Sequence, residues 1–179
     1  MKFKEALKYI QEQMQKMLEE IGEDKIEKAM EYFFEANNIF IYGAGRSGLV
    51  GKAFAIRLVH LGFPTFVIGE TITKPVRKGD LVVLISGSGE TIPVAMTAEI
   101  ARRLGAKIIS ITANPDSHIA RFADLVIVLK PKEKDADLAP LGTLFEASAW
   151  LFLDAIIAEL MNRKGENEES MKRRHATLE

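Results

Sequence analysis

The stretch LVVLISGSGETIP, residues 81–93, is expected to end a buried strand in a loop made almost entirely of glycine and hydroxyl-bearing residues. Its five apolar residues run directly into a loop formed by Ser86, Gly87, Ser88, Gly89, Glu90 and Thr91, after which an apolar periodic run resumes. A plain connection between two elements needs only one or two turn residues. This loop instead carries three hydroxyl groups on a glycine-rich backbone that can turn several N–H groups toward one point. Such a loop is suited to holding an anion without a cation.

Short apolar runs alternate with helical segments through the middle of the chain. The runs are IFIY (39–42), PTFVI (64–68), LVVLI (81–85), KIISI (107–111) and LVIVL (125–129). They are rich in Val and Ile, as strands covered on both faces are. Helical patterns fit between most of them, notably at 92–105, and a long one follows at 143–164. Five strands joined by crossovers predict a three-layer, doubly wound, flavodoxin-like α/β fold with a parallel sheet flanked by helices.

The 179 residues are expected to form one domain. Residues 1–36 carry helical apolar stripes, residues 37–164 form the α/β core, and residues 165–179 form a tail with one short helix. The segment KPKEKDADLAP (130–140) is expected to be a solvated charged loop.

The composition excludes several classes of protein. Lys and Arg number 24 against 25 Asp and Glu, a balance that argues against binding nucleic acid or an anionic membrane. The absence of cysteine excludes disulfides, thiolate metal sites and cysteine nucleophiles. The first residues, MKFKEALKYIQEQMQ, lack the apolar core of a signal peptide, and no apolar run approaches membrane-spanning length. A cytoplasmic protein is expected.

A second glycine-rich loop follows the first predicted strand. Residues 43–48, GAGRSG, match the pattern G-x-G-x-x-G, and Glu70 lies about where a ribose-binding acid is found in nicotinamide-cofactor domains. A tight strand-to-helix turn is the alternative interpretation. Ligands of open α/β sheets bind beyond the carboxyl ends of the strands, where both loops are expected. Two such loops favour a compact phosphorylated ligand, with Ser86, Ser88 and Thr91 around its phosphate. A helix cap explains only one of these three hydroxyls.

Several motifs, in order along the chain, resemble the sugar isomerase (SIS) domain family. They are GAGRSG (43–48), SGSGET (86–91) and PLGTLFE (140–146). Within that family the chain resembles the 6-phospho-3-hexuloisomerases. This resemblance extends through RLVHLGF (57–63), GETITKP (69–75), LFLDAIIAELM (151–161) and RRHATLE (173–179). One glycine loop is weak evidence, whereas this ordered set is specific.

The resemblance implies an isomerase that interconverts D-arabino-3-hexulose 6-phosphate and D-fructose 6-phosphate without a cofactor or metal. It implies a small subunit in a homo-oligomer, expected to be a tetramer. The implied pathway partner is 3-hexulose-6-phosphate synthase of the ribulose monophosphate route, which assimilates formaldehyde or, in reverse, supplies pentose phosphate. The residues expected to contact the phosphorylated hexulose are Gly45, Arg46, Ser47, Ser86, Gly87, Ser88, Gly89 and Thr91.

The reaction itself requires an acid–base group. Moving the carbonyl from C3 to C2 means taking the C2 proton and delivering one to C3 through a 2,3-enediol. Glu146 is the first candidate for the base. However, Thr143-Leu144-Phe145-Glu146 also spells a capping box, in which Glu146 only reaches back to the start of the helix. The resemblance favours the base, because this glutamate matches one at the family's proposed active centre.

His175 is the second catalytic candidate. RRHATLE resembles the family's closing motif, in which a histidine is thought to enter the site from a neighbouring subunit; a solvated tail residue is the alternative. Imidazole titrates near neutral pH, which suits acid–base work. His60, expected in the last turn of a helix, is a reserve candidate, although the helix dipole alone explains it. Glu90 is a second reserve candidate, because related sugar-phosphate isomerases use an acid at this point of the loop. Arg46 is expected to clamp substrate oxygens or stabilise enediolate charge.

Three competing functions are open to this sequence. Another SIS-domain isomerase, of arabinose 5-phosphate or sedoheptulose 7-phosphate, keeps the domain and changes the sugar. The arabinose enzyme usually carries an additional regulatory pair, for which this chain is expected to be too short. A sugar-phosphate sensor is expected to carry a DNA-binding helix-turn-helix, for which residues 1–36 are too few. A nicotinamide-dependent oxidoreductase is the third.

Overall fold

The computed structural model describes residues 1–177 and arranges the predicted strands in one parallel sheet. The strands are β1 (Ile39–Gly43), β2 (Thr65–Val67), β3 (Leu81–Ile85), β4 (Lys107–Thr112) and β5 (Leu125–Val128). Their order across the sheet is β2-β1-β3-β4-β5, and every neighbouring pair is parallel. The predicted five-stranded, doubly wound α/β fold is confirmed.

Both faces of the sheet are buried, which explains why the strands are continuously apolar. Ile39 and Ile41 of β1 face one core, whereas Phe40 between them faces the other. Val82 and Leu84 of β3 join Phe40 on the second face, and all five side chains are fully buried. Successive side chains on a strand point to opposite faces, so a run without polar positions can only lie between two layers.

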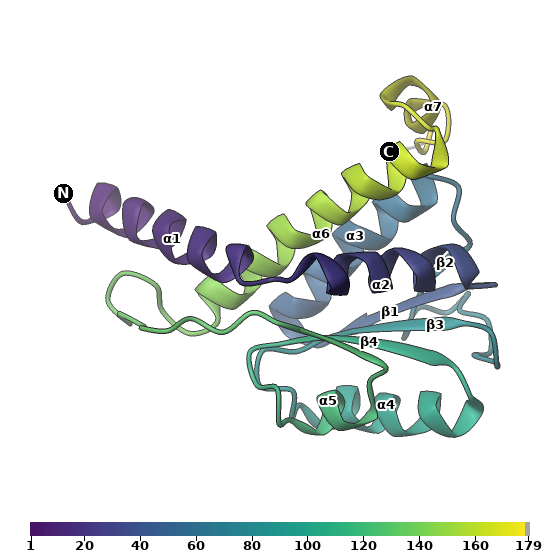
Figure 1. Cartoon of the computed structure of the whole chain (residues 1–179), viewed down its shortest axis with the longest axis horizontal. Helices are drawn as coiled ribbons and strands as arrows, with labels where there is room; N and C mark the ends of the chain where they lie inside the picture. The colour runs from purple at the N-terminus through teal and green to yellow at the C-terminus, as the bar shows by residue number, and fades with distance from the viewer. Residues whose placement is uncertain (178–179) are drawn as a thin grey trace.

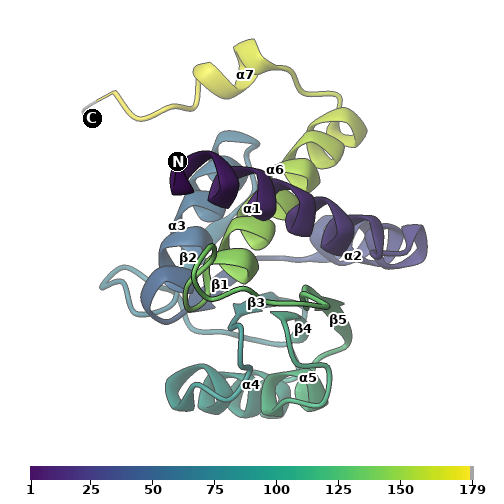
Figure 2. The same ribbon diagram turned by 90° about the vertical axis from the view of Figure 1, so that its left-hand side faces the viewer.

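The larger core lies under three helices, α2 (Glu23–Glu35), α3 (Gly45–His60) and α6 (Thr143–Lys164) (Figures 1 and 2). The helix α1 (Lys2–Glu19) packs on α6 and extends past the edge of the sheet (Figure 1). Its Met17 is 3% exposed and fixes this contact in the core. The N-terminal segment therefore belongs to the same packed layer as the long final helix.

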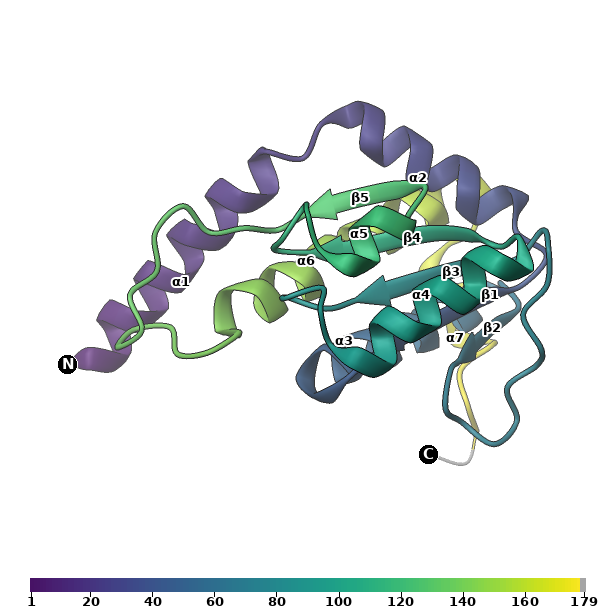
Figure 3. The ribbon, with the colours of Figure 1, turned by 90° about the horizontal axis from the view of Figure 1, so that it is seen from below.

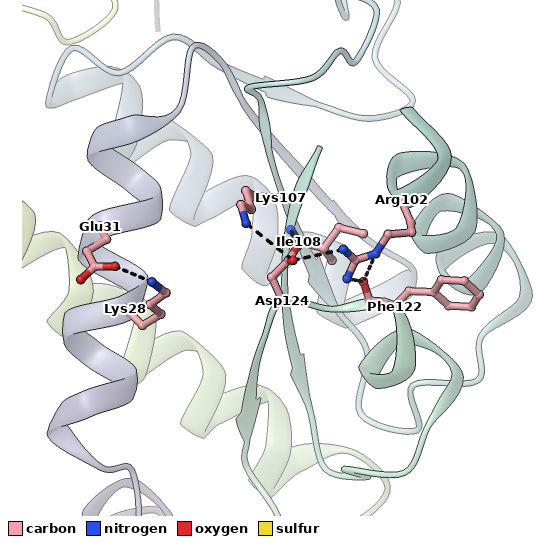
Figure 4. Close-up of polar contacts among 7 residues, drawn as sticks. All are labelled: Lys28, Glu31, Arg102, Lys107, Ile108, Phe122 and Asp124. Carbon is pink, nitrogen blue, oxygen red and sulfur yellow. Dashed lines mark hydrogen bonds and ion pairs between the residues drawn. The ribbon is translucent and has the colours of Figure 1, made fainter. Parts of the chain in front are cut away.

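The opposite face is covered by α4 (Ile92–Leu104) and the short helix α5 (His118–Phe122) (Figure 3). Asp124 joins this layer to the sheet, as Figure 4 shows. Its carboxylate accepts hydrogen bonds from the Ile108 N–H at 2.9 Å and from Arg102 of α4 at 3.1 Å. Lys107 lies 3.8 Å away. On the far side of the sheet in the same view, Lys28 and Glu31 form an ion pair on α2.

The C-terminal tail contains the expected short helix, α7 (Glu168–Lys172). Asn167 caps it, because its side chain accepts the Ser170 N–H at 2.9 Å while the Ser170 hydroxyl accepts the Asn167 N–H at 3.1 Å. Helix α7 lies against α3. No helix within residues 1–177 combines the length and the apolar character needed to cross a membrane.

Candidate active site

The two glycine-rich loops lie side by side, because β1 and β3 are adjacent strands whose carboxyl ends they extend. In a sheet with this strand order, the chain reverses its winding direction between β1 and β3, and ligands bind there. The backbones approach closely. A Cβ on Gly43 would lie 2.9 Å from the Ile85 carbonyl oxygen, and one on Gly48 would lie 2.5 Å from the Gly43 carbonyl oxygen. Glycine at both positions is therefore a requirement of packing.

The hydroxyl-rich loop is shaped from within by Ser86. This residue is 4% exposed, and its hydroxyl lies 3.1 Å from the Thr91 hydroxyl and accepts the Gly89 N–H at 3.1 Å. Gly89 has a φ of +68°, and a Cβ there would collide with Ser117. Thr91 immediately precedes α4, but its side chain forms no capping hydrogen bond. Side-chain capping of α4 therefore does not explain the hydroxyl of Thr91.

Ser88 is the exposed hydroxyl of the loop, and Glu90 follows it. The Ser88 hydroxyl accepts the Glu90 N–H at 3.2 Å and can still donate its own proton. The Glu90 carboxylate accepts the N–H of His118 at 2.9 Å, where α5 begins. His118 also lies 2.7 Å from Glu99 through its Nε2. Glu90 thus has a structural partner outside the pocket described next.

A pocket of about 320 Å³ opens beside both loops. It is lined from four segments by Ser47, Gly87, Ser88, Ala113, Pro131, Lys134, Leu141, Gly142, Leu144, Phe145 and Glu146. Its volume is in the range of small-molecule sites, about 300–1,000 Å³. The phenyl ring of Phe145 packs on Gly87, where an added Cβ would lie 3.1 Å from the ring. Hydroxyl groups and one carboxylate are thereby brought to a common cavity.

Glu146 does not cap α6, so the capping-box alternative is wrong. The helix begins at Thr143 and is preceded by Gly142, and no side chain accepts a hydrogen bond at its start. Thr143 lies one position too far into the helix to act as the cap, and its hydroxyl donates to the Pro140 carbonyl at 2.6 Å. The Glu146 carboxylate instead accepts a hydrogen bond from Arg46 of the first loop.

The Arg46–Glu146 ion pair joins two of the predicted site residues across 100 positions of sequence. The Glu146 side chain is 14% exposed, whereas that of Arg46 is 73% exposed. Arg46 therefore holds the carboxylate from the solvent side while Glu146 lines the pocket. A carboxylate in this position can accept a proton from a bound molecule. The Arg46 guanidinium has further N–H groups that can donate to oxygens of the same molecule.

The two histidine candidates lie together, far from Glu146 in the same chain. The ring of His175 packs against that of His60, with 4.8 Å between centroids. His60 is the last residue of α3, and the glycine loop lies at its first turn, roughly 22 Å away at 1.5 Å per residue. His175 and Glu146 therefore do not meet within one subunit. A contribution of His175 to a neighbouring subunit stays a prediction, and the last two residues of its motif lie outside the described part of the chain.

The segment carrying His175 is fixed by Arg174. This side chain donates to the His60 carbonyl at 3.1 Å and to Glu166 at 2.8 Å. Hydrogen bonds from Arg174, and secondarily from Ser170, lower the pKa of Glu166 to about 2. A second cavity of about 450 Å³, lined in part by His60 and Arg174, lies beside this segment.

Comparison with known proteins assigns the family over most of the chain. Residues 32–151 match the model of the SIS domain. The chain belongs to the SIS domain family. A Bacillus subtilis protein named 3-hexulose-6-phosphate isomerase is 41% identical over 165 residues, which cover 89% of each chain. A Methylomonas aminofaciens protein with the same name is 43% identical over 148 residues, 80% of this chain and 82% of that one. A solved Methanococcus jannaschii structure, from which a 3-hexulose-6-phosphate isomerase function was inferred, has a TM-score of 0.91. It is 37% identical and covers 98% of this chain and 99% of its own.

The acid expected to bind a ribose in a nicotinamide-cofactor domain has a different partner here. Glu70, the expected ribose-binding acid, lies beyond the end of β2 and pairs with Lys52 of α3 at 2.6 Å. The predicted family and fold are confirmed. Within residues 1–177, no group of three or more His, Asp or Glu side chains is arranged to hold a metal ion.

The SIS-domain pocket contains one basic residue that the sequence pattern does not single out. Lys134 lies in the charged segment 130–140, which was expected to be only a solvated loop, yet it lines the pocket with Ser88 and Glu146. Leu141, the residue after this segment, has a φ of +52°, an uncommon value for a residue other than glycine. The position of the segment could have identified Lys134 as a site residue, because the segment follows the carboxyl end of a strand, where ligands bind.

Proposed function

We propose that this SIS-domain protein is a 3-hexulose-6-phosphate isomerase, which interconverts D-arabino-3-hexulose 6-phosphate and D-fructose 6-phosphate. The observation that carries the proposal is the Glu146 carboxylate lining one pocket with the hydroxyl-rich loop. Relatives 41% and 43% identical over most of the chain bear this name, which supports the same substrate here. An isomerase of this kind needs an anion site and a base, and the pocket offers both.

The substrate phosphate binds at the loop from Ser86 to Thr91. The hydroxyls of Ser86, Ser88 and Thr91, with backbone N–H groups at the start of α4, surround the dianion. Ser86 contributes mainly by holding the loop in shape, since its oxygen already contacts Thr91 and Gly89. Gly45, Ser47, Gly87 and the adjacent backbone complete the wall of the site. The positive end of the helix dipole at α4 favours the negative charge.

The Glu146 carboxylate takes the proton from C2 of the 3-hexulose and delivers it to C3. The electron pair of the broken C2–H bond forms the C2–C3 double bond of a 2,3-enediol as the C3 carbonyl oxygen gains a proton. Collapse of the enediol then creates the C2 carbonyl, as the C2 hydroxyl loses its proton and C3 takes the proton held by Glu146. Arg46, beside the carboxylate, stabilises negative charge on the enediol oxygens.

A neighbouring subunit supplies His175 to this pocket. The two rings of His60 and His175 pack together, so a partner would present them as a unit, with His175 moving protons between the oxygens. Exposed apolar side chains on α1 and α6 support an oligomer, proposed as a tetramer. They include Phe3 and Leu7 on α1, and Trp150 and Leu151 on α6.

We place the enzyme in the cytoplasm, next to 3-hexulose-6-phosphate synthase in formaldehyde assimilation by the ribulose monophosphate pathway. The compartment is proposed from the composition. The pathway is proposed from the family resemblance and from the substrate named above.

The test is proton exchange in deuterium oxide. Fructose 6-phosphate incubated with the protein should acquire deuterium at C3, because the reverse reaction takes the C3 proton to reach the 2,3-enediol. Nuclear magnetic resonance of the sugar resolves the position of the label. Exchange at C1 instead indicates a 1,2-enediol, as expected of an arabinose 5-phosphate or sedoheptulose 7-phosphate isomerase, and contradicts the proposal.

Binding measurements separate the remaining alternatives. A sugar-phosphate sensor raises its melting temperature with fructose 6-phosphate but exchanges no proton. A nicotinamide-dependent enzyme is stabilised by NAD instead. Either result overturns the isomerase proposal.

A further inference from the structure

The segment between β5 and α6 carries a lysine into the pocket. Lys134 lines the cavity together with Ser47, Ser88 and Glu146. Among the described residues that line it, Lys134 is the only basic one. No carboxylate within residues 1–177 forms an ion pair with it, whereas Lys132, two positions earlier, pairs with Glu20 at 2.6 Å. The Lys134 ammonium thus has no acidic partner in a cavity that is proposed to receive a dianion.

Both peptide groups that flank Lys134 are held by a single hydroxyl from a distant helix. The hydroxyl of Tyr9, on α1, donates to the Glu133 carbonyl at 3.2 Å. The same oxygen accepts the Asp135 N–H at 2.8 Å. The Glu133 carbonyl belongs to the peptide group before Lys134, and the Asp135 N–H belongs to the one after it. These two contacts restrict the orientation of the Lys134 backbone, and hence the direction in which its side chain leaves it.

The packing of α1 holds the Tyr9 hydroxyl in position. The Tyr9 ring packs against the main core, and Met17 further along α1 accepts a hydrogen bond from Ser148 of α6 at 3.8 Å. Helix α1 and the β5–α6 segment run next to each other in two perpendicular views (Figures 1 and 3). The Lys132–Glu20 ion pair adds a second attachment between them.

We infer that Lys134 binds the phosphate of the substrate and that Tyr9 is the residue that positions it. The inference rests on the proposed function for the identity of the substrate. The phosphate is the chosen partner because Lys134 shares the cavity with Ser88 of the hydroxyl-rich loop, which offers neutral donors only. A cation there adds a charge-assisted hydrogen bond to that neutral cradle. Helix α1 thereby takes part in substrate binding without touching the substrate.

The experiment combines Lys134→Met, Tyr9→Phe and the double variant in full-length protein. Each is assayed by C3 exchange, by calorimetric titration with fructose 6-phosphate, and by inhibition with inorganic phosphate. Lys134→Met should raise KM and the inhibition constant for phosphate about tenfold to a hundredfold with kcat unchanged, the effect of one hydrogen bond to a charged group. Tyr9→Phe, which removes only the hydroxyl, should raise both about threefold to tenfold.

The double variant separates positioning from simple support of the fold. If Tyr9 acts through Lys134, adding Tyr9→Phe to Lys134→Met should change KM less than about twofold. A full, independent effect of Tyr9→Phe in that background overturns the positioning role. Values of KM and Kd for Lys134→Met within about twofold of wild type overturn the phosphate contact.

Two matched controls exclude general effects. Lys130→Met removes the same charge from an exposed position in the same segment outside the pocket, and Tyr32→Phe removes a hydroxyl from α2. Both should leave KM unchanged, and a rise equal to that of Lys134→Met contradicts a specific contact.

Wild-type protein that binds fructose 6-phosphate without C3 exchange overturns the proposed function alone, and the Kd values of the same variants then decide the inference. Wild-type protein that shows neither binding nor exchange overturns both.

Discussion

Replacing Glu146 by glutamine tests the proposed base directly. The amide keeps the shape of the side chain and an oxygen that can accept the hydrogen bond from Arg46, but it cannot accept a proton. Because Glu146 caps nothing, the substitution removes no capping hydrogen bond. It weakens the ion pair with Arg46 and the favourable interaction of a negative charge with the first turn of α6.

The two possible roles of Glu146 predict effects of very different size. Arg46 is 73% exposed, so solvent screens the pair, and its loss should lower the free energy of unfolding by less than about 1 kcal/mol. Loss of a general base lowers the rate by about 10²–10⁴. A hundredfold fall corresponds to about 2.7 kcal/mol in the activation free energy. The catalytic role thus predicts a large loss of turnover with a small loss of stability.

The assay is C3 exchange in fructose 6-phosphate, together with calorimetric binding and urea unfolding of the same preparation. Binding of fructose 6-phosphate should persist, because the phosphate loop is untouched. Glu159→Gln is the matched control, since Glu159 also lies on α6 and pairs with an arginine, Arg163, at 2.6 Å, but does not line the pocket. Exchange by Glu146→Gln within about threefold of wild type would refute the assignment of the base.

Four further predictions concern the loops, the subunit contact and the tail. Ser88→Ala should weaken fructose 6-phosphate binding by about 1–3 kcal/mol with unchanged stability, and unchanged affinity in calorimetry would count against the phosphate site. Gly89→Ala should destabilise the fold by at least about 2 kcal/mol in urea unfolding, because its φ of +68° and the contact with Ser117 exclude a side chain; a neutral effect contradicts this packing. Mixed oligomers of His175→Gln and Glu146→Gln should regain exchange activity that neither variant has alone, whereas no recovery argues against a shared site. Glu166 has a folded-state pKa of about 2, below its usual 4.5, so its stabilisation is present above pH 4.5 and lost toward pH 2. Wild type should lose more stability between pH 5 and pH 3 than Glu166→Gln, and parallel losses would disprove this contribution.

The sheet and its loops could be predicted because their signals are local. Each strand reads as a short apolar run, and the segment expected at 107–111 differs from β4 only by the inclusion of Thr112. The run at 64–68 shortens to Thr65–Val67, because β2 is an edge strand that pairs only with β1. The family motifs then placed the glycine loops, the final helix and Glu146.

The contacts around the pocket could not be predicted, because they depend on residues far apart in the sequence. The capping box at Thr143 fits the pattern, but the helix starts one residue earlier than the box requires, with Gly142 at the cap position just after the positive φ of Leu141. In the sequence, Lys134 is only one residue of a charged run. The structure shows that Tyr9, 125 positions away, forms hydrogen bonds with both peptide groups that flank it. The proposed role of His175 depends on a second subunit, which no pattern within one chain specifies.

The pocket walls depend on one another, which links the proposed phosphate site to the position of the proposed base. Gly87 of the phosphate loop packs on the ring of Phe145, and the next residue is Glu146. Arg46 of the first loop holds the Glu146 carboxylate from the other side. A substrate whose phosphate orders the loop at Gly87 therefore also fixes the backbone that carries the base. Proton transfer between C2 and C3 requires one carboxylate to reach both carbons, so a rigid support of this kind favours an isomerase over a site that only binds its sugar.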